Sequence, residues 1–242
     1  MSHVLACLAV VAALLVLPAT ARAESKVPST TATIAVIGDS LGDGMWGGLA
    51  RTVAKDKRIK IFRGAKNSVG FTGSNLTDMI DRAFASGETH ALVMMVGAND
   101  RRSIFIDGKS KALLRTPAWT ELYRERVERF MDHAGRHNVP LVWILLPVMR
   151  ATDATDDART VNQIVAEAAK GRPNVFLIDT WTLTSDEKGA YLPHFKDLAG
   201  NVRAMRLGDG VHFEMPAYEL FADLVLKKLK DVSPRFKSVL AD

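Results

Sequence analysis

Residues 33–41 read TIAVIGDSL, an apolar run that ends in a turn with a serine at its tip. The run is rich in β-branched residues, as a strand buried on both faces of a parallel sheet requires, and Gly38-Asp39-Ser40 supplies the small and polar residues of a tight turn. Four further short apolar runs have this composition and follow at 59–62, 91–96, 141–146 and 175–178. The sequence therefore predicts five buried parallel strands, the first of them at 33–37.

Amphipathic stretches separate these runs. The clearest lies at 117–137, where apolar residues recur at helical spacing, and the last lies at 217–229, followed by lysines that suit the end of a helix dipole. The alternation predicts an α/β fold, a three-layer sandwich with a central parallel sheet of about five strands. Two stretches, 101–116 and 180–208, lack clear periodicity, and we expect them to form walls of a substrate cleft.

The amino-terminal residues are typical of an export signal. Residues 1–23 combine an apolar run at 4–17 with Pro18 and the small-residue site Ala21-Arg22-Ala23, and a polar linker follows at 24–30. The run is shorter than the roughly 20 apolar residues of a spanning helix, so a cleaved signal peptide is favoured over a retained anchor, the alternative that stays open. We therefore expect an exported bacterial protein, periplasmic or secreted, with a single domain at 31–242.

The composition fits a globular domain and excludes several classes of protein. The chain is 48% hydrophobic and 24% charged, which suffices for one sizeable core. Its only cysteine, Cys7, lies in the signal segment, so the mature chain could form no disulfide. Loss of Arg22 with the signal would lower the formal charge from +5 to +4, a mild value without an obvious basic patch. Neither nucleic-acid binding nor stable membrane insertion after signal cleavage is expected.

Three short motifs stand where an open α/β sheet places its active site. GDSL at 38–41 follows the first strand, GAND at 97–100 follows the third, and DGVH at 209–212 precedes the last helix. The set resembles the SGNH (GDSL) hydrolase superfamily, whose signature blocks are GDS, a glycine, GxND and DxxH in this order. The resemblance extends over residues 34–229 and implies a flavodoxin-like fold and a serine hydrolase. The segments 44–48 and 119–127 also resemble a poorly characterised periplasmic branch of that superfamily.

The motif residues have the chemistry of nucleophilic catalysis. A serine hydroxyl is a poor nucleophile until a base removes its proton, so Ser40 needs an imidazole within hydrogen-bond reach, and His212 is the best candidate. Asp209 lies three residues earlier, from where a carboxylate can accept the imidazole Nδ1 proton and stabilise the imidazolium that forms. The sequence therefore predicts Ser40, Asp209 and His212 as a catalytic triad.

Attack on an ester carbonyl develops an oxyanion, which needs donors held in place. The candidates are the backbone N–H groups of Ser40 and Gly70 and the side-chain amide of Asn99, and the resemblance implies the same three-donor hole. Gly70 is preferred because it follows the second strand and its loop, with Gly73 as the alternative. Three further motif residues are expected to support the loops rather than to act in the chemistry: Asp39, Gly97 and Asp100.

Two other motifs compete for the glycine-rich turn. GDSLG at 38–42 fits the nucleophile elbow of α/β-hydrolases, but that fold would put several strands before the serine and the acid and base on separate loops. GDGMWG at 42–47 fits a dinucleotide fingerprint, but no acidic residue ends the second strand. No cluster has zinc-site spacing, and four histidines are interpreted as loop or helix-surface residues: His90, His133, His137 and His194. Neither a cofactor nor a metal ion is expected.

Three functions are compatible with these residues. The first is an exported serine esterase that hydrolyses small acyl esters, above all O-acetyl esters on a cell-envelope or extracellular glycan, through an acyl-Ser40 intermediate. The second is an acyltransferase that moves the acyl group to a glycan hydroxyl with the same triad. The third is a catalytically silent glycan-binding protein, against which the intact motifs argue. Charged residues and four scattered aromatic residues in the two unpatterned stretches favour a polar carbohydrate over a lipid: Phe105, Trp181, Tyr191 and Phe195.

Overall fold

The computed structural model describes residues 31–106, 108–196 and 200–241. The expected signal peptide and linker, residues 1–30, lie outside this part of the chain. Within it, no helix combines the length and the apolar character that a membrane crossing requires.

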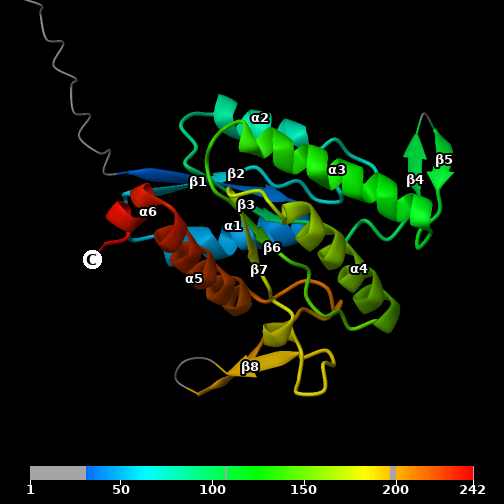
Figure 1. Cartoon of the computed structure of the whole chain (residues 1–242). Coiled ribbons are helices and arrows are strands. Elements are labelled where there is room, and N and C mark those ends of the chain that lie inside the picture. Colours follow the sequence, from blue (N-terminus) through cyan, green and yellow to red (C-terminus); the bar gives the residue numbers. More distant parts are fainter. Residues whose placement is uncertain (1–30, 107, 197–199, 242) are drawn as a thin grey trace, which may run out of the picture.

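Five parallel strands form the central sheet, in the order β2-β1-β3-β6-β7 (Figure 1). They are β1 (Ala32–Gly38), β2 (Ile59–Arg63), β3 (Ala91–Met95), β6 (Leu141–Ile144) and β7 (Val175–Ile178). Every residue of β3 and β6 is buried, which is why these strands read as continuous apolar runs in the sequence. The predicted α/β sandwich around a five-stranded parallel sheet is confirmed.

A side chain shortens β6 relative to the predicted strand. Leu145 still donates to the carbonyl of Ile178 at 2.9 Å, but the backbone of Leu146 pairs with Asn162 instead of a neighbouring strand. Asn162, from α4 (Thr152–Ala169), accepts from the Leu146 N–H and donates to the Leu146 carbonyl, both at 2.8 Å. The amide thus satisfies both backbone groups and ends the ladder, which hydrophobic pattern alone does not reveal.

Helices cover both faces of the sheet (Figure 1). The helices α1 (Ser40–Thr52), α5 (Met215–Val232) and the short α6 (Pro234–Val239) lie on one face, and α2 (Thr77–Ala85), α3 (Pro117–Gly135) and α4 lie on the other. The chain runs from β1 to its neighbour β2 and then turns back, crossing β1 to reach β3, β6 and β7 in that order. Because crossovers between parallel strands are right-handed, this reversal of direction puts the helix before β2 on one face of the sheet and the helices before β3, β6 and β7 on the other.

Glycines in α1 allow it to lie close to α5. A side chain at Gly44 would overlap the ring of Tyr218, and one at Gly48 would meet the Tyr218 carbonyl oxygen at 2.5 Å. Close helix packing therefore explains Gly44, the middle glycine of the segment that mimics a dinucleotide fingerprint, and also the neighbouring Gly48.

The two unpatterned stretches each contain a short antiparallel hairpin. The first pairs β4 (Ile104–Ile106) with β5 (Lys109–Ala112) and extends beyond the start of α3, and the second pairs β8 (His194–Lys196) with β9 (Val202–Ala204), after a 3-10 turn at Thr182–Thr184 (Figure 1). Residues flanking the first hairpin are anchored to α4, because Asp157 accepts from Arg101 at 2.9 Å and from Arg115 at 2.8 Å. Tertiary contacts rather than periodicity therefore position this hairpin.

Candidate active site

The structure brings Ser40, His212 and Asp209 into one continuous hydrogen-bonded chain. Ser40 is the first residue of α1, directly after β1, and His212 lies in the turn before α5. His212 Nε2 lies 2.7 Å from Ser40 Oγ, and His212 Nδ1 lies 2.6 Å from Asp209 Oδ2. In this arrangement a carboxylate orients an imidazole that can take the serine proton. The three side chains meet at the carboxyl edge of the sheet, where β1 ends.

Hydrogen bonds keep the Asp209 carboxylate ionised. Its Oδ1 accepts from the backbone N–H of Val211 at 2.8 Å and of His212 at 2.9 Å. Partial burial raises the pKa of Asp209, but these bonds and the His212 ring outweigh it and lower the pKa to about 2. The carboxylate is therefore charged at neutral pH and can stabilise an imidazolium, although 48% of its side-chain surface is exposed.

A buried arginine that the sequence did not assign to the site supports the same turn. Arg206 donates to the carbonyl of Val211 at 2.8 Å and of Gly210 at 3.2 Å, and its guanidinium lies 4.1 Å from the centre of the Phe213 ring. Burial lowers the pKa of Arg206 to about 10, so it still carries its charge at neutral pH. Within the described residues no carboxylate pairs with it. The carbonyls between Asp209 and His212 are thus among the main partners of this buried charge.

Asp39 joins the turn that carries Ser40 to the turn after β3. Its side chain is fully buried, and its Oδ1 accepts from the N–H of Leu41 at 2.9 Å. Its Oδ2 accepts from the N–H of Gly97 at 3.1 Å and from the amide of Asn99 at 3.3 Å. Burial raises the pKa of Asp39 to about 6, against the opposing effect of these hydrogen bonds. Its contacts fix the ends of two neighbouring strands relative to each other.

Asp100 holds the loop after β2 in a similar way. Its carboxylate accepts from the N–H groups of Phe71 at 3.1 Å and Thr72 at 2.8 Å and from the hydroxyl of Tyr123 at 2.9 Å. Burial raises the pKa of Asp100, and its hydrogen bonds act in the opposite direction. A side chain at Gly70 would overlap the Asp100 carboxylate, so glycine is required there. Asp100 therefore sets the path of the loop that carries the expected Gly70 donor.

Two backbone donors near the site have no acceptor within the described part of the chain. They are the N–H groups of Ser40 and Gly70, as groups available to an oxyanion require. The N–H of Gly73, by contrast, donates to the Gly70 carbonyl at 3.3 Å inside a turn, and Gly73 is exposed. This difference favours Gly70 over Gly73, the alternative that the sequence left open.

The amide of Asn99 lies next to these donors but is engaged by protein acceptors. Its Nδ2 donates to the carbonyl of Val69 at 3.0 Å and to Asp39 Oδ2 at 3.3 Å. An amide has two such protons, so Asn99 could reach an oxyanion only by sharing or releasing the longer bond to Asp39. Asn99 is therefore a less accessible donor in this structure than the two backbone groups.

An apolar pocket of about 140 Å³ opens beside the GAND turn, between α3 and α4. Gly97 and Ala98 form one wall, and Arg101, Arg115 and Asp157 border it with their ion pairs. Most of its remaining lining is apolar: Leu114, Trp119, Leu146, Met149, Ala154, Ala158 and Val161. Its volume is close to that of engineered protein cavities that hold a six-carbon ring. The pocket can therefore accept a short acyl group.

A second, more polar cleft of about 450 Å³ adjoins the turn before His212. Arg150, Arg159 and Lys188 line it, and Arg150 donates to the carbonyl of Gly208 at 2.8 Å. Tyr191 also lines this cleft, but the guanidinium groups of Arg150 and Arg206 lie 5.5 Å and 5.2 Å from its ring centre. Cations therefore flank the Tyr191 ring and dominate the cleft.

One group of side chains outside the site has donor atoms that could hold a metal ion. It consists of Asp81, His133 and His137. The sequence spacing missed this group because Asp81 comes from α2 whereas the histidines come from the end of α3 and the turn after it.

The comparisons with known proteins agree with this architecture. A family model described as Protein of unknown function (DUF459) matches residues 33–228, and no curated protein matches the chain. Similar solved structures include a lipase/acylhydrolase from Enterococcus faecalis, with 16% identity over 83% of this chain and 96% of that chain and a TM-score of 0.58. A putative lipolytic protein of the G-D-S-L family from Desulfitobacterium hafniense DCB-2 has 15% identity over 81% of this chain and 98% of that chain, with a TM-score of 0.55. An acetyl xylan esterase has 13% identity over 81% and 98%, with a TM-score of 0.56. The resemblance to SGNH hydrolases is confirmed at the level of the fold.

Proposed function

The chain belongs to the DUF459 family, and from that premise we propose that it is an exported serine esterase that hydrolyses small acyl esters. One observation carries the proposal: Asp209, His212 and Ser40 form an unbroken hydrogen-bonded chain with links of 2.6 Å and 2.7 Å. The N–H groups of Ser40 and Gly70, which have no acceptor among the residues that the structure describes, add donors beside it. A nucleophile, a base, an orienting acid and oxyanion donors are the parts that acyl transfer requires.

The geometry supports a two-step reaction. Ser40 Oγ attacks the acyl carbon while His212 Nε2 takes the hydroxyl proton, and Asp209 stabilises the resulting imidazolium. The carbonyl oxygen becomes an oxyanion that accepts from the N–H groups of Ser40 and Gly70. The intermediate collapses when His212 returns its proton to the alcohol oxygen, which leaves an acyl-Ser40 ester. Water, deprotonated by His212, then releases the carboxylic acid and restores the serine.

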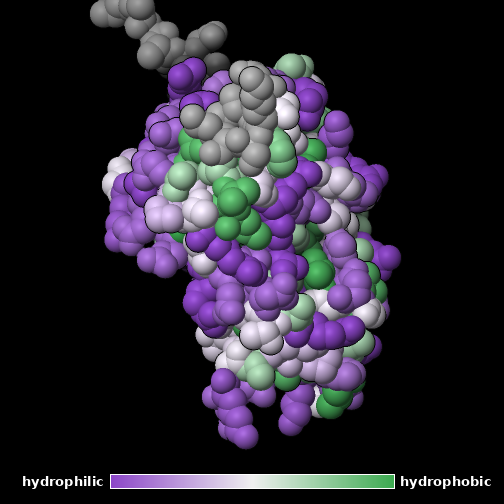
Figure 2. Space-filling model, turned by 90° about the vertical axis from the view of Figure 1, so that its right-hand side faces the viewer, coloured by the Kyte–Doolittle hydropathy of each residue, from purple (hydrophilic) through white to green (hydrophobic). Residues whose placement is uncertain are grey.

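We place the acyl group of the substrate in the 140 Å³ pocket beside Gly97 and Ala98 and the alcohol in the cationic cleft beside the turn before His212. The pocket fits an acetyl or another short acyl chain. The cleft, with Arg150, Arg159 and Lys188, suits a hydroxyl-rich and anionic partner such as a glycan. The face that carries α4 and the β4–β5 hairpin is largely hydrophilic with small apolar patches, which fits a polar substrate better than a lipid surface (Figure 2).

Acyl transfer to a glycan is the second candidate, because the cationic cleft adjoining the Asp209–His212 turn could hold an acceptor hydroxyl as well as a leaving alcohol. Both reactions use the same acyl-Ser40 intermediate, and they differ only in whether water or a sugar hydroxyl attacks it. Export of the protein is part of the proposal and rests on the apolar segment at 4–17 and the small residues at 21–23.

A chromogenic ester series from acetyl to decanoyl, run on the wild type and on Ser40→Ala, tests this function. We expect turnover of the acetyl ester by the wild type and none above background by the variant. An added glycan acceptor distinguishes hydrolysis from transfer, because acylated glycan accumulates only in transfer. Equal rates for the wild type and Ser40→Ala would refute the serine mechanism. Fractionation of cells that express the full chain tests export. We expect to recover the protein outside the cytoplasmic fraction.

A further inference from the structure

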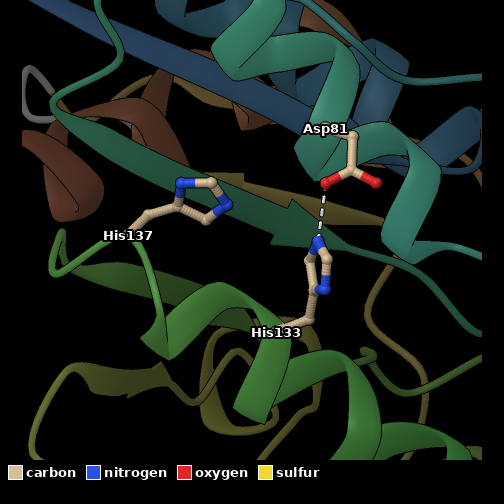
Figure 3. Close-up of side chains that lie close together, drawn as sticks. All are labelled: Asp81, His133 and His137. Carbon is tan, nitrogen blue, oxygen red and sulfur yellow. Dashed lines mark hydrogen bonds and ion pairs between the residues drawn. The ribbon is translucent and has the colours of Figure 1, made fainter.

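Two histidines and an aspartate from separate helices converge on the face of the sheet opposite α1 and α5. Asp81 projects from α2, His133 from the last turns of α3, and His137 from the turn that follows α3 (Figure 3). One ligand atom of each lies within 4.8 Å of those of the other two, and Asp81 Oδ1 lies 2.6 Å from His133 Nε2. The two histidines are four residues apart in the sequence, and their ring centres lie 5.9 Å apart.

These donor atoms have the type and spacing of a transition-metal site. Zinc binds imidazole nitrogen and carboxylate oxygen at about 2.0–2.2 Å, which puts neighbouring ligand atoms of a tetrahedral site roughly 3.3–3.5 Å apart. The Asp81–His133 pair is closer than this, and no ligand atom of the cluster is farther than 4.8 Å from another. The three atoms therefore lie close to the spacing that coordination of one ion requires.

The surroundings of the cluster keep one ligand in place. The His137 ring stacks on Phe84 of α2, with ring centres 3.7 Å apart and planes 9° apart. Only 22% of the His133 side-chain surface is exposed to solvent, whereas 57% of the Asp81 side-chain surface is exposed. Two semi-buried imidazoles and one exposed carboxylate leave room for a water molecule as the fourth ligand.

We propose that Asp81, His133 and His137 bind a divalent transition-metal ion of the zinc type, which joins α2 to α3. The helices α2 and α3 lead into β3 and β6, so the turn after α3 lies toward the amino edge of the sheet, whereas Ser40 lies at the carboxyl edge. The ion would act as a structural clamp between two helices and would take no part in ester hydrolysis. Imidazole and carboxylate donors favour zinc, nickel or copper over calcium or magnesium, which prefer oxygen alone.

Calorimetric titration of the untagged full chain with zinc, after treatment with a chelator, tests the site. We expect one ion per chain, and a zinc concentration ten times the dissociation constant should raise Tm by roughly 3–6 °C. Two variants should each abolish this rise: the single variant Asp81→Asn, and a double variant in which His133→Gln is combined with His137→Gln. Asp81→Asn keeps the shape of the side chain and its contact with His133, so it changes little besides the charge and the ligand atom.

His194→Gln is the matched control, because His194 is an exposed histidine on β8 outside the cluster, and it should keep the full zinc response. Tm without zinc is measured for every variant, so that a variant that is misfolded is recognised before its response is compared. Absence of zinc binding by the wild type would overturn the proposal, as would an unchanged zinc response in the double histidine variant.

Discussion

The guanidinium of Arg206 lies against the ring of Phe213, 4.1 Å from its centre, on the inner side of the turn that presents His212. Two bonds from Arg206 reach the carbonyls of Gly210 and Val211, inside the Asp209–His212 motif itself. Backbone hydrogen bonds also hold this motif, from the Leu207 N–H to the His212 carbonyl at 2.9 Å and from the Arg150 N–H to the Gly210 carbonyl at 3.1 Å. The buried charge therefore makes the alignment of the base depend on a residue outside the motif.

We predict that Arg206→Met lowers kcat by about 10- to 100-fold and changes KM little, because small displacements of a catalytic group have effects of this size. The measurement is steady-state kinetics with an acetyl ester, together with Tm. Arg206→Lys should recover part of kcat, since an ammonium keeps the charge and can donate to the carbonyls of Gly210 and Val211, but lacks the second nitrogen that donates to Val148. A fall in Tm with unchanged kcat would assign Arg206 a purely structural role.

Ser40→Ala and His212→Ala should each lower kcat by several orders of magnitude, and the double variant should be barely slower than either. The reason is that the serine and its base act as one unit, joined here by a 2.7 Å hydrogen bond. The assay is acetyl ester turnover with active-site titration to confirm equal amounts of folded protein. If the losses multiplied, one of the two residues would be structural and the assigned nucleophile–base pair would be incorrect.

Asp209→Asn should reduce kcat by a large factor, up to about 10⁴-fold, yet less than Ser40→Ala. The side-chain oxygen of asparagine should stay with the N–H groups of Val211 and His212, which leaves its NH₂ facing His212 Nδ1. That contact favours the tautomer with its proton on Nε2, which cannot accept the proton of Ser40. Kinetics on the folded variant measure the effect, and wild-type activity would remove Asp209 from the triad.

The sheet could be predicted from the sequence, whereas the loops around the site could not. The strands β1, β3 and β7 lie within one or two residues of the predicted runs, because β1 and β3 are almost wholly buried and the half-buried edge strand β7 is apolar as well. The hairpin after β3 gives no periodic signal, since ion pairs of Arg101 and Arg115 with Asp157 anchor its flanks. Such pairs join residues more than 40 positions apart, and sequence patterns do not register them.

The residues of the candidate site also fall into those that sequence patterns identify and those that they do not. Ser40, His212 and Asp209 were identifiable because each lies in a short motif at the end of a strand or before a helix. Arg206 gave no signal, because an arginine in a polar loop reads as solvated surface. The cluster of His133 and Asp81 was missed because its members are 52 positions apart. Its only local sign was a second histidine one helical turn after the first.

The raised pKa of Asp39 predicts a pH dependence of stability. Burial raises this pKa from 3.8 to about 6, so between these values the folded protein binds the proton more tightly than the unfolded chain does. The stability contributed by protonated Asp39 is therefore fully present below about pH 4 and is lost as the pH rises through about 6. The largest loss that this shift allows is about 3 kcal/mol.

Urea unfolding of the wild type and Asp39→Asn from pH 4 to 7 measures this effect. The free energy of unfolding of the wild type minus that of the variant should decrease as the pH rises, because only the wild type loses the proton. Carboxylates that do not interact with position 39 titrate equally in both proteins and cancel in the difference. Asp100 does not cancel, because its charge contributes to the raised pKa of Asp39, so the difference reports Asp39 together with its coupling to Asp100. A difference that stays constant over this range would show that Asp39 does not ionise there.

The last prediction concerns the length of the acyl chain. If the 140 Å³ pocket receives the acyl group, acetyl and butyryl esters should react well and decanoyl esters poorly, since ten carbons exceed a volume that holds a six-carbon ring. Ala158→Leu places a larger side chain in the pocket wall from α4 at only a small cost in helix propensity, and it should lower the butyryl-to-acetyl ratio of kcat/KM by about tenfold. Ala118→Leu, on the exposed start of α3, is the control and should leave the ratio unchanged. Equal losses for both esters in Ala158→Leu would place the acyl group elsewhere, and a wild type that prefers decanoyl esters would replace the short-acyl proposal with a lipase.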